Sequence, residues 1–166
     1  TSRLIVHASV KNELLERMGA YIREWKMGDP LDPENRVGSL VSPEHFAKVK
    51  SYLEHASAEK LEVVYGGATK DGAFVEPTVI DGVGRDNRLF QEEIFGPVLS
   101  VTTFNTISEA IALANDTVYG LAASVYTGSL RRAIKLSREI RAGIVTVNCF
   151  GEGDASTPFG GYKESG

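Results

Sequence analysis

The chain has 166 residues, of which 42% are hydrophobic and 24% are charged, a composition typical of a globular protein with a core of its own. Its formal net charge is −4 and basic residues are scattered among acidic ones, which argues against a nucleic-acid partner. No apolar run reaches the roughly 20 residues that span a bilayer, so no membrane contact is expected. We therefore expect a soluble, cytoplasmic protein with a single domain over residues 1–166.

The first part of the chain predicts one strand and two helices. Aliphatic and β-branched residues over 3–7 predict a strand, and apolar residues at helical spacing predict an amphipathic helix that Ser9 opens. Ser42 and Pro43 are typical of the cap and the first position of a second helix. Both helices are expected to pack through one apolar face.

Strand patterns dominate the remainder of the chain. The runs 61–65 and 74–80 flank glycines that permit positive φ, so an antiparallel ribbon is expected, and Pro77 favours an edge position. Apolar and amphipathic segments then alternate: strand 98–104, helix 106–115, strand 121–126, helix 129–141 and strand 144–147. This βαβαβ pattern predicts an α/β fold with a mainly parallel sheet.

The segment 91–97, Gln-Glu-Glu-Ile-Phe-Gly-Pro, sets carboxylates and an aromatic beside a turn just before an apolar run. At the mouth of a buried parallel strand, such a loop would lie where α/β enzymes bind ligands. Neighbouring side chains of an extended segment point to opposite sides, so Glu92 and Glu93 are not expected to act as a paired acid and base. The alternative is a turn with solvated glutamates and Phe95 in the core.

Four sequence segments, in this order and spacing, resemble the aldehyde dehydrogenase superfamily, and aminoaldehyde or γ-glutamyl-aminobutyraldehyde dehydrogenases in particular. They are QEEIFGP at 91–97, NDTVYGLAASVYT at 115–127, VNCF at 147–150 and PFGGYKESG at 158–166. The resemblance implies a three-layer α/β/α domain, most of the catalytic domain of that family. Because the chain begins at Thr1 and ends within a glycine-rich run, we interpret it as a fragment without the cofactor-binding domain and the oligomerisation strand.

The resemblance implies cofactor contacts at four positions and NAD or NADP as the cofactor. Glu93 matches a glutamate that binds the ribose next to the nicotinamide, and Phe95 matches an aromatic that packs on the nicotinamide ring. A carboxylate can accept two hydroxyl hydrogen bonds, and a phenyl face suits a planar ring. His45 and Lys48, one helical turn apart, match positions that are commonly Gln and Lys, so His45 departs from the pattern. A solvated helix face is the alternative for this pair.

No catalytic residue is expected within the chain. Cys149 is the only cysteine, so it has no partner for an internal disulfide, and the three histidines lack metal-ligand spacing. In the family, the nucleophilic cysteine lies just upstream of a Ser-Arg pair that leads into a strand, which Ser2 and Arg3 match. The nucleophile should therefore precede Thr1, and the general-base glutamate should lie further upstream. Cys149 is expected to pack near the pocket, and the isolated chain is expected to be inactive.

The glycine-rich run from Asn148 to Lys163 predicts a long loop. The resemblance implies that this loop lines the aldehyde entrance, with substrate contacts at Phe150, Gly151, Glu152, Gly153, Asp154 and Phe159. The carboxylates of Glu152 and Asp154 would favour a polar or cationic tail, such as that of an amine-bearing aldehyde or the aldehyde of a γ-glutamylated amine. In the alternative, both carboxylates point to water.

The whole protein is thus expected to oxidise an aldehyde to a carboxylic acid through a cysteine thiohemiacetal and thioester, with hydride transfer to NAD(P)+. The family also implies a homo-oligomer. Alternatives within the superfamily are an acylating enzyme, a semialdehyde dehydrogenase, and a related protein that has lost its nucleophile and serves as a binding module. A hydrolase is the weakest alternative, because the chain has no Gly-x-Ser-x-Gly motif.

Overall fold

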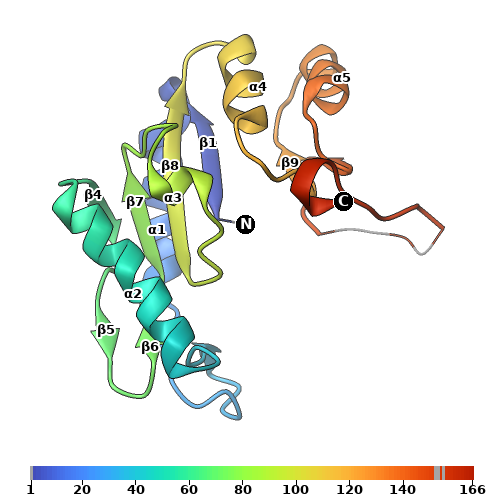
Figure 1. The fold of residues 1–166 in the computed structure, drawn as a ribbon. Helices are drawn as coiled ribbons and strands as arrows, with labels where there is room; N and C mark the ends of the chain where they lie inside the picture. The colour runs from blue at the N-terminus through green and yellow to red at the C-terminus, as the bar shows by residue number, and fades with distance from the viewer. Residues whose placement is uncertain (1, 152–153, 155) are drawn as a thin grey trace. The chain divides into compact units, whose positions relative to one another are not determined.

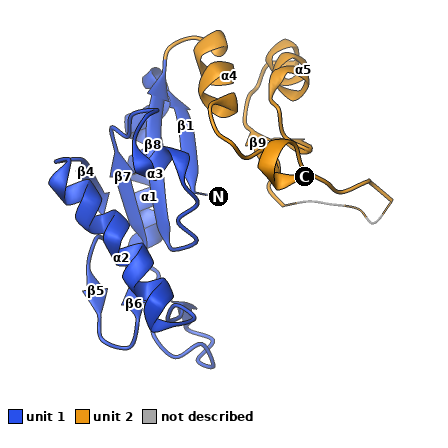
Figure 2. Cartoon of the chain, viewed as in Figure 1, with its two compact units in different colours: residues 1–104 blue, residues 105–166 orange. Residues whose placement is uncertain are grey.

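The computed structural model describes residues 2–151, 154 and 156–166, so Glu152 and Gly153 lie outside the described residues. The chain divides into two compact units, residues 1–104 and residues 105–166, which Figure 2 colours separately. Each unit is described by itself below. The expectation of a single domain over residues 1–166 stays a prediction.

A four-stranded sheet forms the centre of the first unit, in the order β1-β8-β7-β4 (Figure 1). These strands are β1 (Arg3–His7), β8 (Val98–Phe104), β7 (Thr78–Asp81) and β4 (Glu62–Tyr65). β8 pairs in parallel with β1 and β7, whereas β4 pairs antiparallel with β7. The predicted α/β fold with a mainly parallel sheet is confirmed.

The predicted ribbon between 61–65 and 74–80 is confirmed in its antiparallel sense and corrected in its details. The second run divides into β6 (Phe74–Val75), which forms a small hairpin with β5 (Thr69–Lys70), and β7. The edge position favoured by Pro77 is wrong, because β7 lies between β8 and β4. Pro77 precedes the first residue of β7, where a missing N–H does not interrupt the ladder. A further parallel pair, β2 (Lys26–Met27) with β3 (Asn35–Val37), lies in the segment before the second helix.

Helices cover both faces of this sheet: Figure 1 shows α1 behind it and α2 with α3 in front. α1 (Ala8–Arg23) begins one residue earlier than predicted, because His7 is its cap and accepts a hydrogen bond from the Ser9 N–H at 3.1 Å. α2 (Pro43–Ala58) has the predicted cap, since the Ser42 hydroxyl accepts from the His45 N–H at 3.1 Å. α3 (Arg88–Gln91) was not predicted. Leu15 of α1 forms one buried hydrophobic cluster with three residues of the strands: Val6, Val79 and Val101.

The second unit contains the predicted pattern of helices and strands after strand 98–104, whereas that strand, β8, belongs to the sheet of the first unit and not to the sheet of β9 and β10. Its elements are α4 (Ile107–Asn115), β9 (Ala122–Val125), α5 (Leu130–Glu139), β10 (Ile144–Val147) and the short 3₁₀-helix η1 (Lys163–Ser165). β9 and β10 pair in parallel, with α5 between them in sequence, which confirms this βαβ step. Thr106 caps α4, because its hydroxyl accepts from the Glu109 N–H at 3.2 Å.

The final segment of the second unit is held by both backbone and side-chain hydrogen bonds. The Tyr162 N–H donates to the Gly120 carbonyl at 3.0 Å, and the Glu164 N–H donates to the Val118 carbonyl at 3.0 Å. Lys163 adds two hydrogen bonds from its ammonium group to main-chain carbonyls, each at 2.8 Å. Gly143 faces this segment so closely that an added Cβ would lie 1.8 Å from the Gly160 carbonyl oxygen. Within the described residues, no helix is long and apolar enough to cross a membrane.

Replacement of Gly143 by alanine is therefore expected to destabilise the protein. The new methyl group would meet backbone atoms, which cannot rotate away, so the free energy of unfolding should fall by about 1–3 kcal/mol or the segment should detach. Urea unfolding of the two proteins measures this difference. Gly128→Ala is the matched control in the same unit, since nothing lies within 4 Å of its added Cβ. An equal loss of unfolding free energy in both variants would contradict the close packing of Gly143 against the Gly160 carbonyl.

Candidate functional site

The loop 91–97 lies at the edge of the sheet where the parallel strands begin. It precedes β8, and Thr78 is the register partner of Val98 at the start of both strands. The Thr78 N–H donates to the Pro97 carbonyl at 2.7 Å. The sequence predicts this loop at the position where α/β enzymes bind ligands, which is the carboxyl end of the parallel strands. That prediction is wrong for this sheet, because the loop lies at the amino ends of the strands. The start of β1 reaches the same edge, where the Ser2 carbonyl accepts from the Ser100 N–H at 2.9 Å.

The two adjacent glutamates have different surroundings. The Glu92 carboxylate accepts a hydrogen bond from the Tyr52 hydroxyl at 2.8 Å, and the Arg88 Nε donates to its two oxygens at 3.0 and 3.1 Å. The Tyr52 hydroxyl, together with Arg88, holds the pKa of Glu92 below its ordinary value. The Glu93 side chain is exposed, and within the described residues its carboxylate has no hydrogen bond or ion pair. Only Glu93 is thus available to a ligand.

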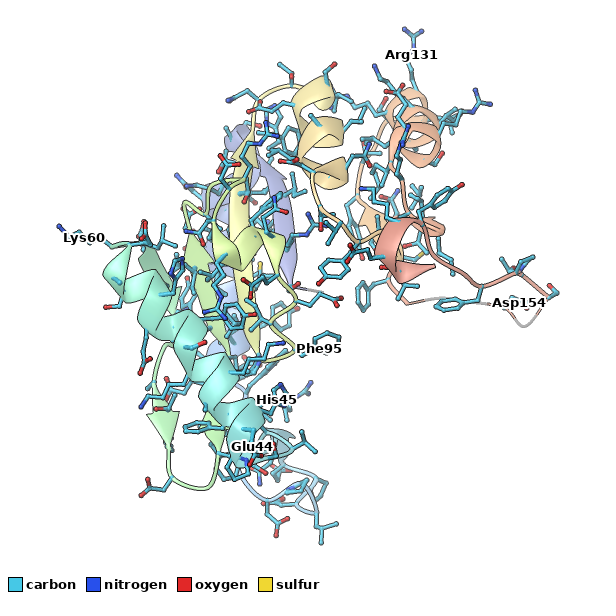
Figure 3. The ribbon with its side chains drawn as sticks, in the orientation of Figure 1. Glu44, His45, Lys60, Phe95, Arg131 and Asp154 are labelled. Atoms are coloured by element: carbon cyan, nitrogen blue, oxygen red, sulfur yellow. The ribbon has the colours of Figure 1, made fainter. Side chains whose placement is uncertain are left out.

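Phe95 does not enter the core, so the alternative of a buried phenylalanine is wrong. Its side chain is 69% exposed, whereas the preceding Ile94 is fully buried. The backbone of Phe95 has φ of +55°, a left-handed conformation that costs about 1–2 kcal/mol for a residue with a Cβ. Strain of this kind persists where the surroundings impose it, and it often marks a ligand site. Figure 3 shows the ring projecting from the loop.

Lys48 lies beside the loop, and His45 lies one turn earlier on α2. The Lys48 ammonium group donates to the Glu93 carbonyl at 3.2 Å and lies 6.0 Å from the centroid of the Phe95 ring. Both ring nitrogens of His45 are buried and have no hydrogen-bond partner within the described residues. The first unit therefore brings together three of the four predicted cofactor contacts, Lys48, Glu93 and Phe95, and leaves His45 with unused polar atoms on the same helix.

The predicted substrate contacts that the structure describes all lie in the second unit. Phe150 and Phe159 are 65% and 74% exposed, and Gly151 has φ of +68°. The Asp154 carboxylate accepts hydrogen bonds from the N–H and the hydroxyl of Ser156 at 2.8 and 2.5 Å. These bonds hold the pKa of Asp154 below its ordinary value, so the side chain is negatively charged at neutral pH.

Two residues of the loop environment were missed by sequence reasoning, namely Tyr52 and Arg88. Tyr52 resembles an ordinary core residue of an amphipathic helix, and nothing in the sequence pairs it with a loop far along the chain. Arg88 and Glu92 have the i, i+4 spacing of a helical ion pair, which was the available signal. No group of three or more potential metal ligands occurs within the part of the chain that the structure describes.

The model of the aldehyde dehydrogenase family matches residues 1–166. The chain is 75% identical to an aminoacetaldehyde dehydrogenase from Pseudomonas aeruginosa and 42% identical to aminoaldehyde dehydrogenase 2, peroxisomal, from Pisum sativum. Each match covers 100% of the chain and 34% of the relative.

Solved structures of full enzymes contain the same fold. An NAD-dependent aldehyde dehydrogenase from Sinorhizobium meliloti superposes with a TM-score of 0.95 at 41% identity, over 99% of the chain and 33% of that protein. A betaine aldehyde dehydrogenase from Staphylococcus aureus, solved in complex with NAD+, superposes with a TM-score of 0.92 at 37% identity, over 98% of the chain and 34% of that protein. The chain therefore belongs to the aldehyde dehydrogenase family and spans about one third of the length of these relatives.

Proposed function

We propose that the chain is the part of an NAD(P)-dependent aldehyde dehydrogenase that holds the nicotinamide half of the cofactor and lines the aldehyde entrance. Membership of the family supports the reaction. The observation that carries the role of this segment is the loop at Glu93 and Phe95, which presents a free carboxylate and a strained, exposed ring beside Lys48.

Glu93 and Phe95 divide the binding of the nicotinamide riboside between them. The Glu93 carboxylate accepts hydrogen bonds from the two ribose hydroxyl groups, and the Phe95 face contacts the planar ring without offering a competing proton donor. Lys48 supplies positive charge that suits the diphosphate, and His45, whose buried ring nitrogens have no described partner, can contact a cofactor hydroxyl group once its ring turns outward. When bound, NAD(P)+ accepts the hydride of the aldehyde.

The nucleophilic cysteine is proposed to lie in the residues before Thr1. β1 runs parallel to β8, so residues that precede Ser2 approach the sheet edge at which the loop 91–97 lies. A thiolate carried there would attack the aldehyde carbon close to the nicotinamide end of the cofactor. The general base belongs to a part of the protein outside this chain.

An aldehyde with a positively charged amino group is the proposed substrate class. Two relatives with aminoaldehyde names, at 75% and 42% identity, support this choice. The Asp154 carboxylate is charged, exposed and close in sequence to Phe159, which matches an aromatic of the substrate tunnel. A negative potential at the entrance raises the local concentration of a cationic substrate.

We propose a cytoplasmic enzyme that forms homo-oligomers, on the strength of the composition and the family resemblance. One of the relatives is peroxisomal by name, so fractionation of cells that contain the protein is the direct measurement of its compartment.

Glu93→Gln in the full-length enzyme should raise the KM for the cofactor roughly tenfold, because one of the carboxylate hydrogen bonds is lost. Steady-state kinetics with varied NAD+ measures this change. Glu54→Gln is the matched control, since Glu54 is an exposed glutamate of the same unit whose described ion pair is with Lys50 at 3.7 Å. Unchanged cofactor kinetics in Glu93→Gln would refute the ribose contact.

A comparison of Phe95→Gly with Phe95→Ala separates the backbone strain at this position from the role of the ring in cofactor binding. Both variants should weaken cofactor binding, because both lose the ring. The glycine variant should be more stable than the alanine variant by about 1 kcal/mol, since glycine adopts the left-handed conformation without cost. At Tyr21, an exposed position within α1, the same pair should show the reverse order. An alanine variant as stable as the glycine variant at position 95 would disprove the strain.

Asp154→Asn should lower kcat/KM for an amine-bearing aldehyde about threefold to tenfold and leave a neutral alkyl aldehyde of equal length unaffected. The asparagine oxygen can still accept from Ser156, so the turn should persist. The difference between the substrates should shrink in high salt, which screens an exposed charge. Equal losses for both aldehydes would show that Asp154 does not recognise the amine.

A further inference from the structure

Tyr52, Arg88 and Glu92 form a closed cluster between α2 and the loop 91–97. Tyr52 is fully buried, and its hydroxyl reaches the Glu92 carboxylate at 2.8 Å. The Arg88 Nε donates to both oxygens of the same carboxylate, and the centre of its guanidinium group lies 4.2 Å from the centroid of the Tyr52 ring. Each member of the cluster therefore contacts the other two. Arg88 also donates to the Ser51 hydroxyl at 3.3 Å, a second contact with α2.

The protonation states of the cluster are compatible with this arrangement at neutral pH. Burial, followed by the hydrogen bond to Glu92, raises the pKa of Tyr52, so its hydroxyl keeps the proton that it donates. The hydrogen bond from Tyr52 lowers the pKa of Glu92, which stays a carboxylate, and Arg88 stays a cation. A charged acceptor shared by two donors gives short, directional hydrogen bonds. Glu92 is thereby held in one orientation although its side chain is 49% exposed.

The direction of Glu92 decides the direction of Glu93. The backbone at Glu92 is extended, with φ of −103° and ψ of 155°, and successive side chains of an extended segment point to opposite sides. A Glu92 side chain fixed against α2 turns that of Glu93 away from α2. Lys48 holds the Glu93 carbonyl at 3.2 Å, and the buried Ile94 fixes the next residue. The parts of the loop left free are the Glu93 carboxylate and the Phe95 ring.

We propose that Arg88, Glu92 and Tyr52 are positioning residues, which orient Glu93 and Phe95 toward the cofactor without touching the cofactor themselves. This inference rests on the proposed function of those two residues. It assigns to the first glutamate of the Glu92-Glu93 pair a role distinct from that of the second. It also implies that α2 and the loop bind the cofactor together. A change that displaces the loop from α2 should therefore weaken the cofactor contacts of both Lys48 and Glu93.

The test uses the full-length enzyme with Tyr52→Phe and Glu92→Gln. Tyr52→Phe removes only the hydroxyl and keeps the buried ring, and Glu92→Gln weakens the acceptor. Each variant should raise the Kd for NADH, followed by its fluorescence, and the KM for NAD+ roughly fivefold, because the contacts are partly exposed. Because both changes act on the same hydrogen bond, the double variant should weaken NADH binding by less than the sum of the two single effects.

A stability control separates positioning from general damage. Lys11→Met breaks the ion pair with Asp81, whose side chain is only 8% exposed, on a different part of the same unit. This variant should lower the free energy of unfolding and leave the Kd for NADH unchanged. Arg88→Lys is the conservative variant, and it should retain more affinity than Arg88→Met, because the charge remains while the planar fork and its stacking are lost.

The outcomes distinguish the two proposals. Unchanged NADH binding in Tyr52→Phe and Glu92→Gln, with weaker binding in Glu93→Gln, would overturn the positioning role and leave the proposed function intact. Unchanged binding in Glu93→Gln as well would overturn both. A Kd that rises in Lys11→Met as much as in Tyr52→Phe would show a response to lost stability, and this result would also reject the cluster as a positioning device.

Discussion

The close approach of Gly96 to Val49 is the contact on which the arrangement of the candidate cofactor site depends. A Cβ at Gly96 would lie 2.8 Å from both methyl carbons of the fully buried Val49, so only glycine lets the loop lie this near α2. At this separation between the loop and α2, tyrosine and lysine side chains of the helix are long enough to contact the loop. The hydrogen bonds from Tyr52 to Glu92 and from Lys48 to the Glu93 carbonyl follow from that approach.

The elements that sequence predicted well are those whose signals are local. The cap of α2 is made by Ser42 through a bond to a residue three positions later, and the run of β8 is short and rich in β-branched residues, which favours a strand over a helix. The cap of α1 was misjudged because histidine can replace serine in the same role. The place of β7 within the sheet could not be read from Pro77, since strand order depends on pairings between distant segments.

The candidate site shows the same division between local and distant information. The opposite directions of Glu92 and Glu93 follow from strand geometry alone and were predicted. The identity of the group that holds Glu92 was not, because Tyr52 lies 40 positions earlier and a tyrosine in an amphipathic helix is usually part of the core. The exposed ring of Phe95 was expected only through the family resemblance, since hydrophobicity alone would bury it.

The backbone anchoring of the last segment bears on how this protein can change. Residues 162 and 164 are fixed by their N–H groups to carbonyls of Gly120 and Val118, bonds that every amino acid except proline can make. The side chains at these two positions can therefore be exchanged during evolution while the path of the chain is kept, whereas Lys163 between them is anchored through its side chain. Substitutions at residues 162 and 164 can therefore change the surface chemistry of the segment at little cost to folding.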